Sequence, residues 1–252
     1  MNIPILYEDS ELLIIDKPAG LVVNRAQSVK ESTVQDWAEA YLSFPRTRES
    51  RDVEPGSPIE SGMAVNDDFY DRAGIVHRID KETSGILLIA KTPEAFIELQ
   101  RQFKEREIKK TYLAIVHGKL VPEEGEINAP IDRTPWNPQR FGVMPGGKEA
   151  VTRYRRISNF QYPISNETMS LAELYPETGR THQIRVHLKY INHPIVGDYL
   201  YAGRKVSRRD RAGDAPRVML HAWKISFIHP GTKKVLAIES PIPDDMKSIV
   251  YG

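Results

Sequence analysis

Short apolar runs separated by polar turns recur along the chain and predict a strand-rich protein. Near the N-terminus, residues 5–7 and 12–15 are apolar runs on either side of the acidic turn Glu8-Asp9-Ser10, as expected for two strands joined by a turn. Residues 229–232 (H-P-G-T) form a second turn signal of this kind. The other strand-like runs lie at residues 21–23, 86–90, 110–118, 171–175, 219–227 and 235–238.

Three segments have the periodicity and end signals of helices. The first is predicted at about 33–41, with Ser32 as its cap and Gln35 in the capping-box position. Thr92 followed by Pro93 predicts the start of the second. Residues 180–190 are the third, with apolar positions that recur on one side. Strands dominate without a regular βαβ rhythm, so we expect an α+β fold around a mixed, mostly antiparallel sheet with flanking helices.

The segment from Ser43 to Asp71 differs in composition from the rest of the chain. It is rich in Arg, Glu, Pro, Ser, Gly and Asp and has no apolar period. We interpret it as a long, partly disordered surface insertion within one domain that spans residues 1–252.

Composition limits the possible function classes. The 252 residues include no cysteine, which excludes disulfides, thiol catalysis and cysteine-ligated zinc. No apolar run approaches the roughly 20 residues that a membrane-spanning helix needs. The first nine residues lack a basic segment, so they do not resemble a secretory signal, and we expect a cytoplasmic protein.

The formal net charge is only +1, so any site for a polyanion depends on local clusters of cations. Residues 101–110 and 204–217 are the two basic stretches, and acidic residues interrupt both. Their charge pattern alone favours a solvated helix face for the first and a mobile loop for the second.

Residues 76–85, V-H-R-I-D-K-E-T-S-G, precede the apolar run Ile86–Ala90 and carry the strongest chemical signal. A carboxylate at Asp80, on a turn beside a buried strand, is well placed to act on a ligand. The same carboxylate could instead cap its own turn through the amides of Thr83 and Ser84. The residues alone leave both interpretations open.

The string H-R-I-D-x-x-T-S-G closely resembles the signature of the RluA-type pseudouridine synthases. Other segments resemble that family in the expected order: Lys17-Pro18-Ala19-Gly20, the strand 110–118 (K-T-Y-L-A-I-V-H-G), 179–188 (G-R-T-H-Q-I-R-V-H-L), 193–198 (H-P-I-V-G-D) and Leu220-His221-Ala222. The resemblance covers nearly the whole chain. Its departures are Ile79, where leucine is commonest, and the long insertion.

The resemblance implies the pseudouridine synthase fold and a reaction that moves a uracil base from an N1–C1′ to a C5–C1′ bond within RNA, without metal or organic cofactor. It makes Asp80 the catalytic residue and Tyr112 the residue that packs on an extruded base. It makes Arg185 the cation that keeps Asp80 ionised. A guanidinium suits this role because it stays charged and can bind a carboxylate with two hydrogen bonds.

Four further residues are candidates for binding the substrate. By the resemblance, Arg78 fills the gap that an extruded base leaves. Arg180, at the expected helix start, is placed nearer the RNA backbone. His77 and Thr83 belong to the signature itself.

The histidines do not predict a metal site. His182 and His187 are five positions apart and do not share a helical face as an i, i+4 pair would. We expect these two and His193 to be hydrogen-bonded structural residues.

Partners and alternatives follow from the resemblance. Its first motif begins near residue 5, so we expect a stand-alone catalytic domain, without the S4 domain of many relatives, that acts as a monomer on ribosomal RNA, transfer RNA or both. One alternative is a non-catalytic RNA-binding protein on the same fold. Another is an acid–base hydrolase that uses Asp80 with His77.

Overall fold

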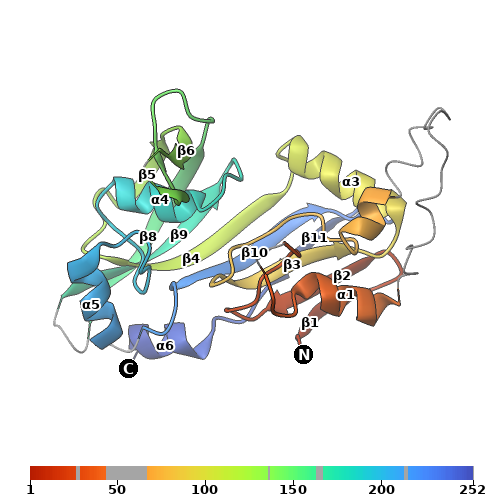
Figure 1. The fold of residues 1–252 in the computed structure, drawn as a ribbon, viewed down its shortest axis with the longest axis horizontal. Helices are drawn as coiled ribbons and strands as arrows, with labels where there is room; N and C mark the ends of the chain where they lie inside the picture. Colours follow the sequence, from red (N-terminus) through yellow and green to blue (C-terminus); the bar gives the residue numbers. More distant parts are fainter. Residues whose placement is uncertain (27–28, 44–66, 136, 163–166, 213–214, 252) are drawn as a thin grey trace.

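One long sheet organises the molecule (Figure 1). The computed structural model describes residues 1–26, 29–43, 67–135, 137–162, 167–212 and 215–251. The strands of the sheet are β1 (Ile5–Glu8), β2 (Leu12–Lys17), β3 (Ser84–Ala90), β4 (Lys109–His117), β5 (Glu124–Asn128), β8 (Val151–Gln161), β9 (Thr168–Pro176), β10 (Leu220–Ile228) and β11 (Val235–Glu239).

The sheet is mixed and mostly antiparallel, as predicted. Its order is β1-β2-β3-β10-β4-β9-β8-β5, and β11 also pairs with β10. Within the described residues, β3 with β10 is the one parallel pair, and it spans only Ser84 and Gly85 on β3. One edge of β10 pairs with β4. The other edge pairs first with β3 and then, from Lys224 onward, with β11.

The remaining elements are a separate hairpin and the helices. The hairpin consists of β6 (Ile131–Thr134) and β7 (Asn137–Val143). The helices are α1 (Val34–Leu42), α3 (Pro93–Lys104), α4 (Gln183–Tyr190), α5 (Arg204–Ala212) and α6 (Asp244–Tyr251). In the view of Figure 1, α3 lies above β10 and β11 and α4 lies above β8 and β9, whereas α1, α6 and both termini lie below the central strands.

The apolar run on β3 is explained by burial on both faces. Ile86 and Leu88 pack in one cluster with Phe96 and Leu99 of α3. Leu87 and Ile89 pack in another cluster, which includes Val34 and Ala38 of α1. A strand covered on both faces is expected to be continuously apolar rather than alternating.

Two predicted helices begin later than expected. The cap of α1 is Thr33 rather than Ser32, and Asp36 rather than Gln35 completes its capping box. The third helix begins at Gln183, since the preceding residues form a turn in which the Gln183 side-chain oxygen accepts the Arg180 amide. The start at Thr92 and Pro93 is confirmed.

Two other expectations about local structure are wrong. Residues 21–23 are not a strand, because the carbonyls of Val22 and Val23 accept the first two amides of α1. The basic segment 204–217 begins with α5 instead of a loop, and its Asp210 is fully buried.

Most of the predicted insertion 43–71 lies outside the described residues. Its last part does not fit the prediction: residues 67–71 are helical, and Phe69 packs in the cluster under α3. The strands β5 to β8 and the helix α6 were not predicted.

Candidate active site

Asp80 lies on the loop that leads into β3, and the geometry of this loop depends on a glycine. The amide of Thr83 donates to the Asp80 carbonyl over 3.1 Å, which closes a turn. Gly85 follows with φ +109°, and a β-carbon there would lie 2.3 Å from the carbonyl oxygen of Ala222 on β10. A larger residue cannot occupy such a contact. The signature glycine therefore lets β3 approach β10, directly beneath the Asp80 turn.

The Asp80 carboxylate is paired with Arg185 on α4, 105 positions away in the sequence. Arg185 Nη1 lies 3.2 Å from Asp80 Oδ2. The other side of the guanidinium holds Asp198, with Nε–Oδ2 at 2.8 Å and Nη2–Oδ1 at 2.9 Å. Asp198 is fully buried. Its two hydrogen bonds hold the guanidinium in a fork geometry and leave one nitrogen for Asp80.

Burial and charge act in opposite directions on Arg185. Burial works to lower its pKa, but the hydrogen bonds and charge of Asp198, followed by those of Asp80, raise the pKa above its usual value. The guanidinium therefore remains a cation inside the protein, and it is an effective counter-ion for Asp80.

Tyr112 is placed on β4 between β9 and β10, where it pairs with Leu174 and Ala222. Burial, and secondarily the charge of Asp80, raise the pKa of its hydroxyl. Tyr112 is thus a neutral phenol next to the carboxylate. Its ring borders the same cavity as Asp80 and Arg185.

A buried lysine supports the Asp80 loop from behind. Lys17 is fully buried, and its ammonium donates to the carbonyls of Pro18, Leu21 and Lys81 over 2.9 to 3.0 Å. Burial lowers the pKa of Lys17 to about 7, while the charges of Glu82 and Asp80 oppose that effect. The Lys17-Pro18-Ala19-Gly20 motif therefore lies against the residue that follows Asp80.

The four candidate substrate-binding residues all line this cavity. His77 also has a backbone partner, because its Nε2 accepts the Leu88 amide over 3.0 Å, and burial, then Lys110, lower its pKa to about 3. Thr83 is buried, and Arg78 is exposed. Arg180 is exposed and donates from Nε to the Glu149 carbonyl over 2.9 Å.

Two residues of this site, Asp198 and His182, were not expected to take part in the site. Asp198 belongs to a family-like segment, but nothing in the sequence connects it with Arg185. His182 was expected to be structural; it does bond to Tyr201, yet it also lines the cavity, with Nε2 4.0 Å from Asp80 Oδ1. His182 and Arg185 are three positions apart, and this spacing indicates that both side chains lie on the same side of the chain at the start of α4.

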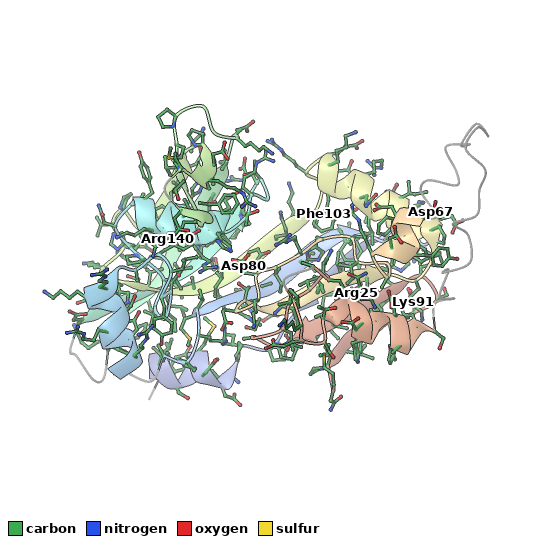
Figure 2. The ribbon with its side chains drawn as sticks, in the orientation of Figure 1. Arg25, Asp67, Asp80, Lys91, Phe103 and Arg140 are labelled. Atoms are coloured by element: carbon green, nitrogen blue, oxygen red, sulfur yellow. The ribbon has the colours of Figure 1, made fainter. Side chains whose placement is uncertain are left out.

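The cavity around Asp80 has a volume of about 550 Å³, within the usual range for small-molecule sites. Figure 2 shows Asp80 near the middle of the molecule, between Phe103 of α3 and Arg140 of β7. Two of the described residues that line it are acidic, Asp80 and Glu177, whereas six are cationic: Arg78, Lys104, Arg106, Lys110, Arg180 and Arg185. A near-neutral chain thus has a strongly cationic cavity.

Within the described part of the chain, no group of three or more His, Asp or Glu side chains has the arrangement of a metal site. No described helix is long and apolar enough to cross a membrane.

The fold and site define a class of protein in which an arginine-paired carboxylate lies in a cationic, nucleotide-sized cavity beside a mixed sheet. The sequence profile described as RNA pseudouridylate synthase matches residues 11–190. The chain therefore belongs to the RNA pseudouridylate synthase family.

Individual relatives agree with this assignment. The chain is 40% identical over 250 residues to ribosomal large subunit pseudouridine synthase D of Nitrosomonas europaea, covering 98% of this chain and 64% of that protein. It is 37% identical over 250 residues to the uncharacterized RNA pseudouridine synthase YlyB of Bacillus subtilis, covering 99% of this chain and 72% of the relative. The solved structure of human RNA pseudouridylate synthase domain containing 1 has a TM-score of 0.69 and 26% identity, covering 95% of this chain and 83% of the other.

Proposed function

We propose that this protein is an RNA pseudouridine synthase in which Asp80 is the catalytic residue. The observation that supports this most is the contact of Asp80 with Arg185 inside the cationic cavity, next to Tyr112. Family membership supplies the reaction class. The geometry supplies one carboxylate with a permanent counter-ion and an aromatic side chain beside it.

The chemistry begins with an extruded uridine. Target atoms of a base are inaccessible within a stacked helix, so the nucleotide must leave the stack to enter the cavity. The Tyr112 ring offers a flat apolar face for the base. Arg78, exposed at the cavity, is suited to the space that the base vacates.

Asp80 then acts as an ionised carboxylate on the sugar or the base. Attack on the sugar, attack on the base and abstraction of a ribose proton each start from this charged form. In every case the N1–C1′ bond breaks, the C5–C1′ bond forms, C5 loses its proton and N1 gains one, so the product is an isomer of the substrate. Arg185 is the counter-ion of the Asp80 carboxylate, and Asp198 holds Arg185 in place.

The target and the biological setting are part of the same proposal. The name of the Nitrosomonas relative refers to the large ribosomal subunit, which makes ribosomal RNA the first substrate to test and transfer RNA the second. We further propose that residues 1–252 form a single catalytic domain that works as a cytoplasmic monomer and needs no cofactor.

Replacement of Asp80 by asparagine tests this function. The Asp80→Asn variant keeps the side-chain volume but loses the charge that every route requires. We expect pseudouridine formation in ribosomal or transfer RNA to fall by more than about 1,000-fold, whereas the dissociation constant for RNA stays within about threefold. Pseudouridine mapping and filter binding measure the two quantities.

Asp132→Asn is a matched control on the exposed part of the β6–β7 hairpin, and it should retain full activity. Product formed by Asp80→Asn at the wild-type rate would refute the assignment of Asp80. RNA binding by the wild type without any product would favour a binding protein on this fold, and release of free uracil would favour a hydrolase.

A further inference from the structure

Among the described residues, His182 is the side chain that pairs with the second carboxylate oxygen of Asp80, Oδ1. Arg185 holds Asp80 Oδ2, whereas His182 Nε2 lies 4.0 Å from Oδ1, too far for a hydrogen bond but close enough to share a ligand. His182 precedes α4 with φ 56°, a left-handed conformation that non-glycine residues adopt at a cost in energy. The fold therefore maintains an unfavourable backbone geometry where this imidazole enters the cavity.

Tyr201 holds the other side of the imidazole. Its Oη lies 2.8 Å from His182 Nδ1 and accepts the Phe141 amide of β7 over 3.1 Å. The Phe141 ring also packs edge-on against the imidazole, with centroids 5.8 Å apart. His182 is therefore held by Tyr201, which follows α4 in the chain, and by Phe141 of the hairpin.

These contacts select one tautomer of the imidazole. A tyrosine hydroxyl has a single hydrogen. Its oxygen accepts from the Phe141 amide, and among the described residues His182 Nδ1 is the atom paired with this hydroxyl that can accept its hydrogen; Tyr201 as a whole is only 9% exposed. His182 Nδ1 is then unprotonated and Nε2 carries the hydrogen. Burial, as the main cause, lowers the pKa of His182, which favours this neutral form near pH 7.

We propose that His182, held as the Nε2–H tautomer by Tyr201, is a substrate-contacting residue that donates a hydrogen bond to a carbonyl oxygen of the target uracil. The inference rests on the proposed pseudouridine synthase function. It adds a donor to the site beyond Asp80, Tyr112 and Arg185.

The chemistry of the base explains why a donor is useful at this position. When the N1–C1′ bond breaks, its electron pair stays with the uracil, and the negative charge spreads to the carbonyl oxygens. A fixed N–H aimed at such an oxygen stabilises the charge as it develops. The position beside Asp80 Oδ1 suits this purpose, because the sugar and the base must both lie close to that oxygen. No proton transfer from His182 is required.

Imidazole ¹⁵N NMR of the free protein tests the tautomer without any activity measurement. We expect wild-type His182 to show a protonated Nε2 and an unprotonated Nδ1, and we expect the Nε2–H signal to shift when a uridine-containing RNA oligonucleotide is added. Tyr201→Phe keeps the ring that lies 5.0 Å from the Arg185 guanidinium carbon but should give a mixture of tautomers. A protonated Nδ1 in the wild type, or an Nε2–H signal that is unchanged by saturating RNA, would overturn the inference.

Single-turnover kinetics with excess enzyme test the contact itself. We expect His182→Asn, which tolerates the left-handed conformation but cannot place an amide at the Nε2 position, to react about 100-fold more slowly, with RNA affinity within threefold of wild type. Tyr201→Phe should react about 10-fold more slowly, and the double variant should be no slower than His182→Asn. Tyr199→Phe is the matched control, since its hydroxyl donates to the Ala215 carbonyl, and it should react at the wild-type rate.

Substrate substitution identifies the acceptor atom. Sulfur accepts hydrogen bonds weakly, so 2-thiouridine or 4-thiouridine at the target position should slow the wild type at one of the two positions and leave His182→Asn indifferent to that replacement. Equal rates for wild type and His182→Asn, or equal sensitivity of both to sulfur, would refute the contact. If the wild type modifies no RNA, the proposed function fails separately, and the NMR result still decides the tautomer and its response to RNA.

Discussion

At the scale of single residues, the site works because charges are paired in a fixed order. Asp198 holds two nitrogens of Arg185, and the remaining nitrogen meets Asp80. Truncation of Arg185 would leave the buried Asp198 carboxylate without its ionic partner, which costs more than the loss of a surface pair. The triad gives the partly buried Asp80 carboxylate a fixed counter-ion and a fixed orientation.

Arg185→Lys tests whether the forked geometry matters in addition to the charge. A lysine has one terminal nitrogen, so it cannot hold both oxygens of Asp198 and still reach Asp80. We expect the rate at saturating RNA to fall about 100-fold or more. Arg25→Lys is the control, since Arg25 binds Asp36 and Glu39 on the surface, and it should stay within twofold of wild type. Equal rates for both variants would show that charge alone suffices.

At the scale of elements, local capping decides where the first helix starts. Ser32 and Thr33 both have a hydroxyl, but the structure uses Thr33, whose Oγ1 accepts the Asp36 amide over 3.2 Å. The amides of Val34 and Gln35 already bond to the carbonyls of Val22 and Val23. The preceding chain thus fixes the register of the cap.

Thr33→Ala and Ser32→Ala form a matched pair for this cap. Loss of an N-cap hydroxyl typically costs about 1 kcal/mol, so Thr33→Ala should lower the free energy of unfolding by about that amount. Ser32→Ala should change it by less than about 0.5 kcal/mol. Urea unfolding measures both, and a larger effect at Ser32 would contradict the observed cap.

The β1–β2 turn is held by a carboxylate whose stability contribution depends on pH. Asp9 Oδ1 accepts the amides of Glu11 and Leu12, and Oδ2 accepts the Tyr7 hydroxyl, each over 2.8 Å. Burial works to raise the pKa of Asp9, but these hydrogen bonds outweigh it and lower the pKa to about 2 from 3.8. A lowered folded-state pKa contributes stability above pH 3.8 that is lost as the pH falls through about 2.

Asp9→Asn tests this dependence. The shift corresponds to about 2 kcal/mol at neutral pH, so the variant should be less stable than wild type by roughly that amount at pH 7. The difference should shrink between pH 4 and pH 2. Asp244→Asn, at an exposed carboxylate on α6, should give a difference that varies much less with pH. A constant deficit for Asp9→Asn across this range would show that its carboxylate charge is not the cause.

At the scale of the whole molecule, the important electrostatic property is the distribution of charge over the surface and the cavity. The net charge of +1 conceals a cavity that six cationic side chains line. Many other cations are neutralised locally, for example Arg101 by Glu98, Glu105 and Glu107. RNA affinity should therefore depend on a few cavity residues and should fall as salt rises.

Lys104→Ala tests this distribution. Lys104 is an exposed residue at the end of α3 that lines the cavity. Loss of one phosphate contact should reduce the slope of log affinity against log salt by about 0.7 to 0.9, with an unchanged rate at saturating RNA. Lys119→Ala, an exposed lysine that does not line the cavity, should leave the slope unchanged. Equal slopes for all three proteins would place the phosphate contacts elsewhere.

The sequence by itself determined the strand-rich class, the helix start at Thr92 and Pro93, and the family, through motifs that keep fixed local spacing. Periodicity and capping are local properties, so a single sequence can reveal them. It could not reveal the strands β5 to β8, whose partly exposed and irregular patterns depend on pairing between distant segments.

Only the tertiary structure decided how the site is assembled. Asp80 and Arg185 are 105 positions apart, and the sheet order places β3 and β4 on either side of β10, which brings the Asp80 loop, Tyr112 and α4 to one cavity. The same packing placed His182, which bonds to Tyr201, within 4.0 Å of Asp80 and placed Asp198 against Arg185. Contacts between segments so far apart arise when buried side chains pack, and no local pattern encodes them.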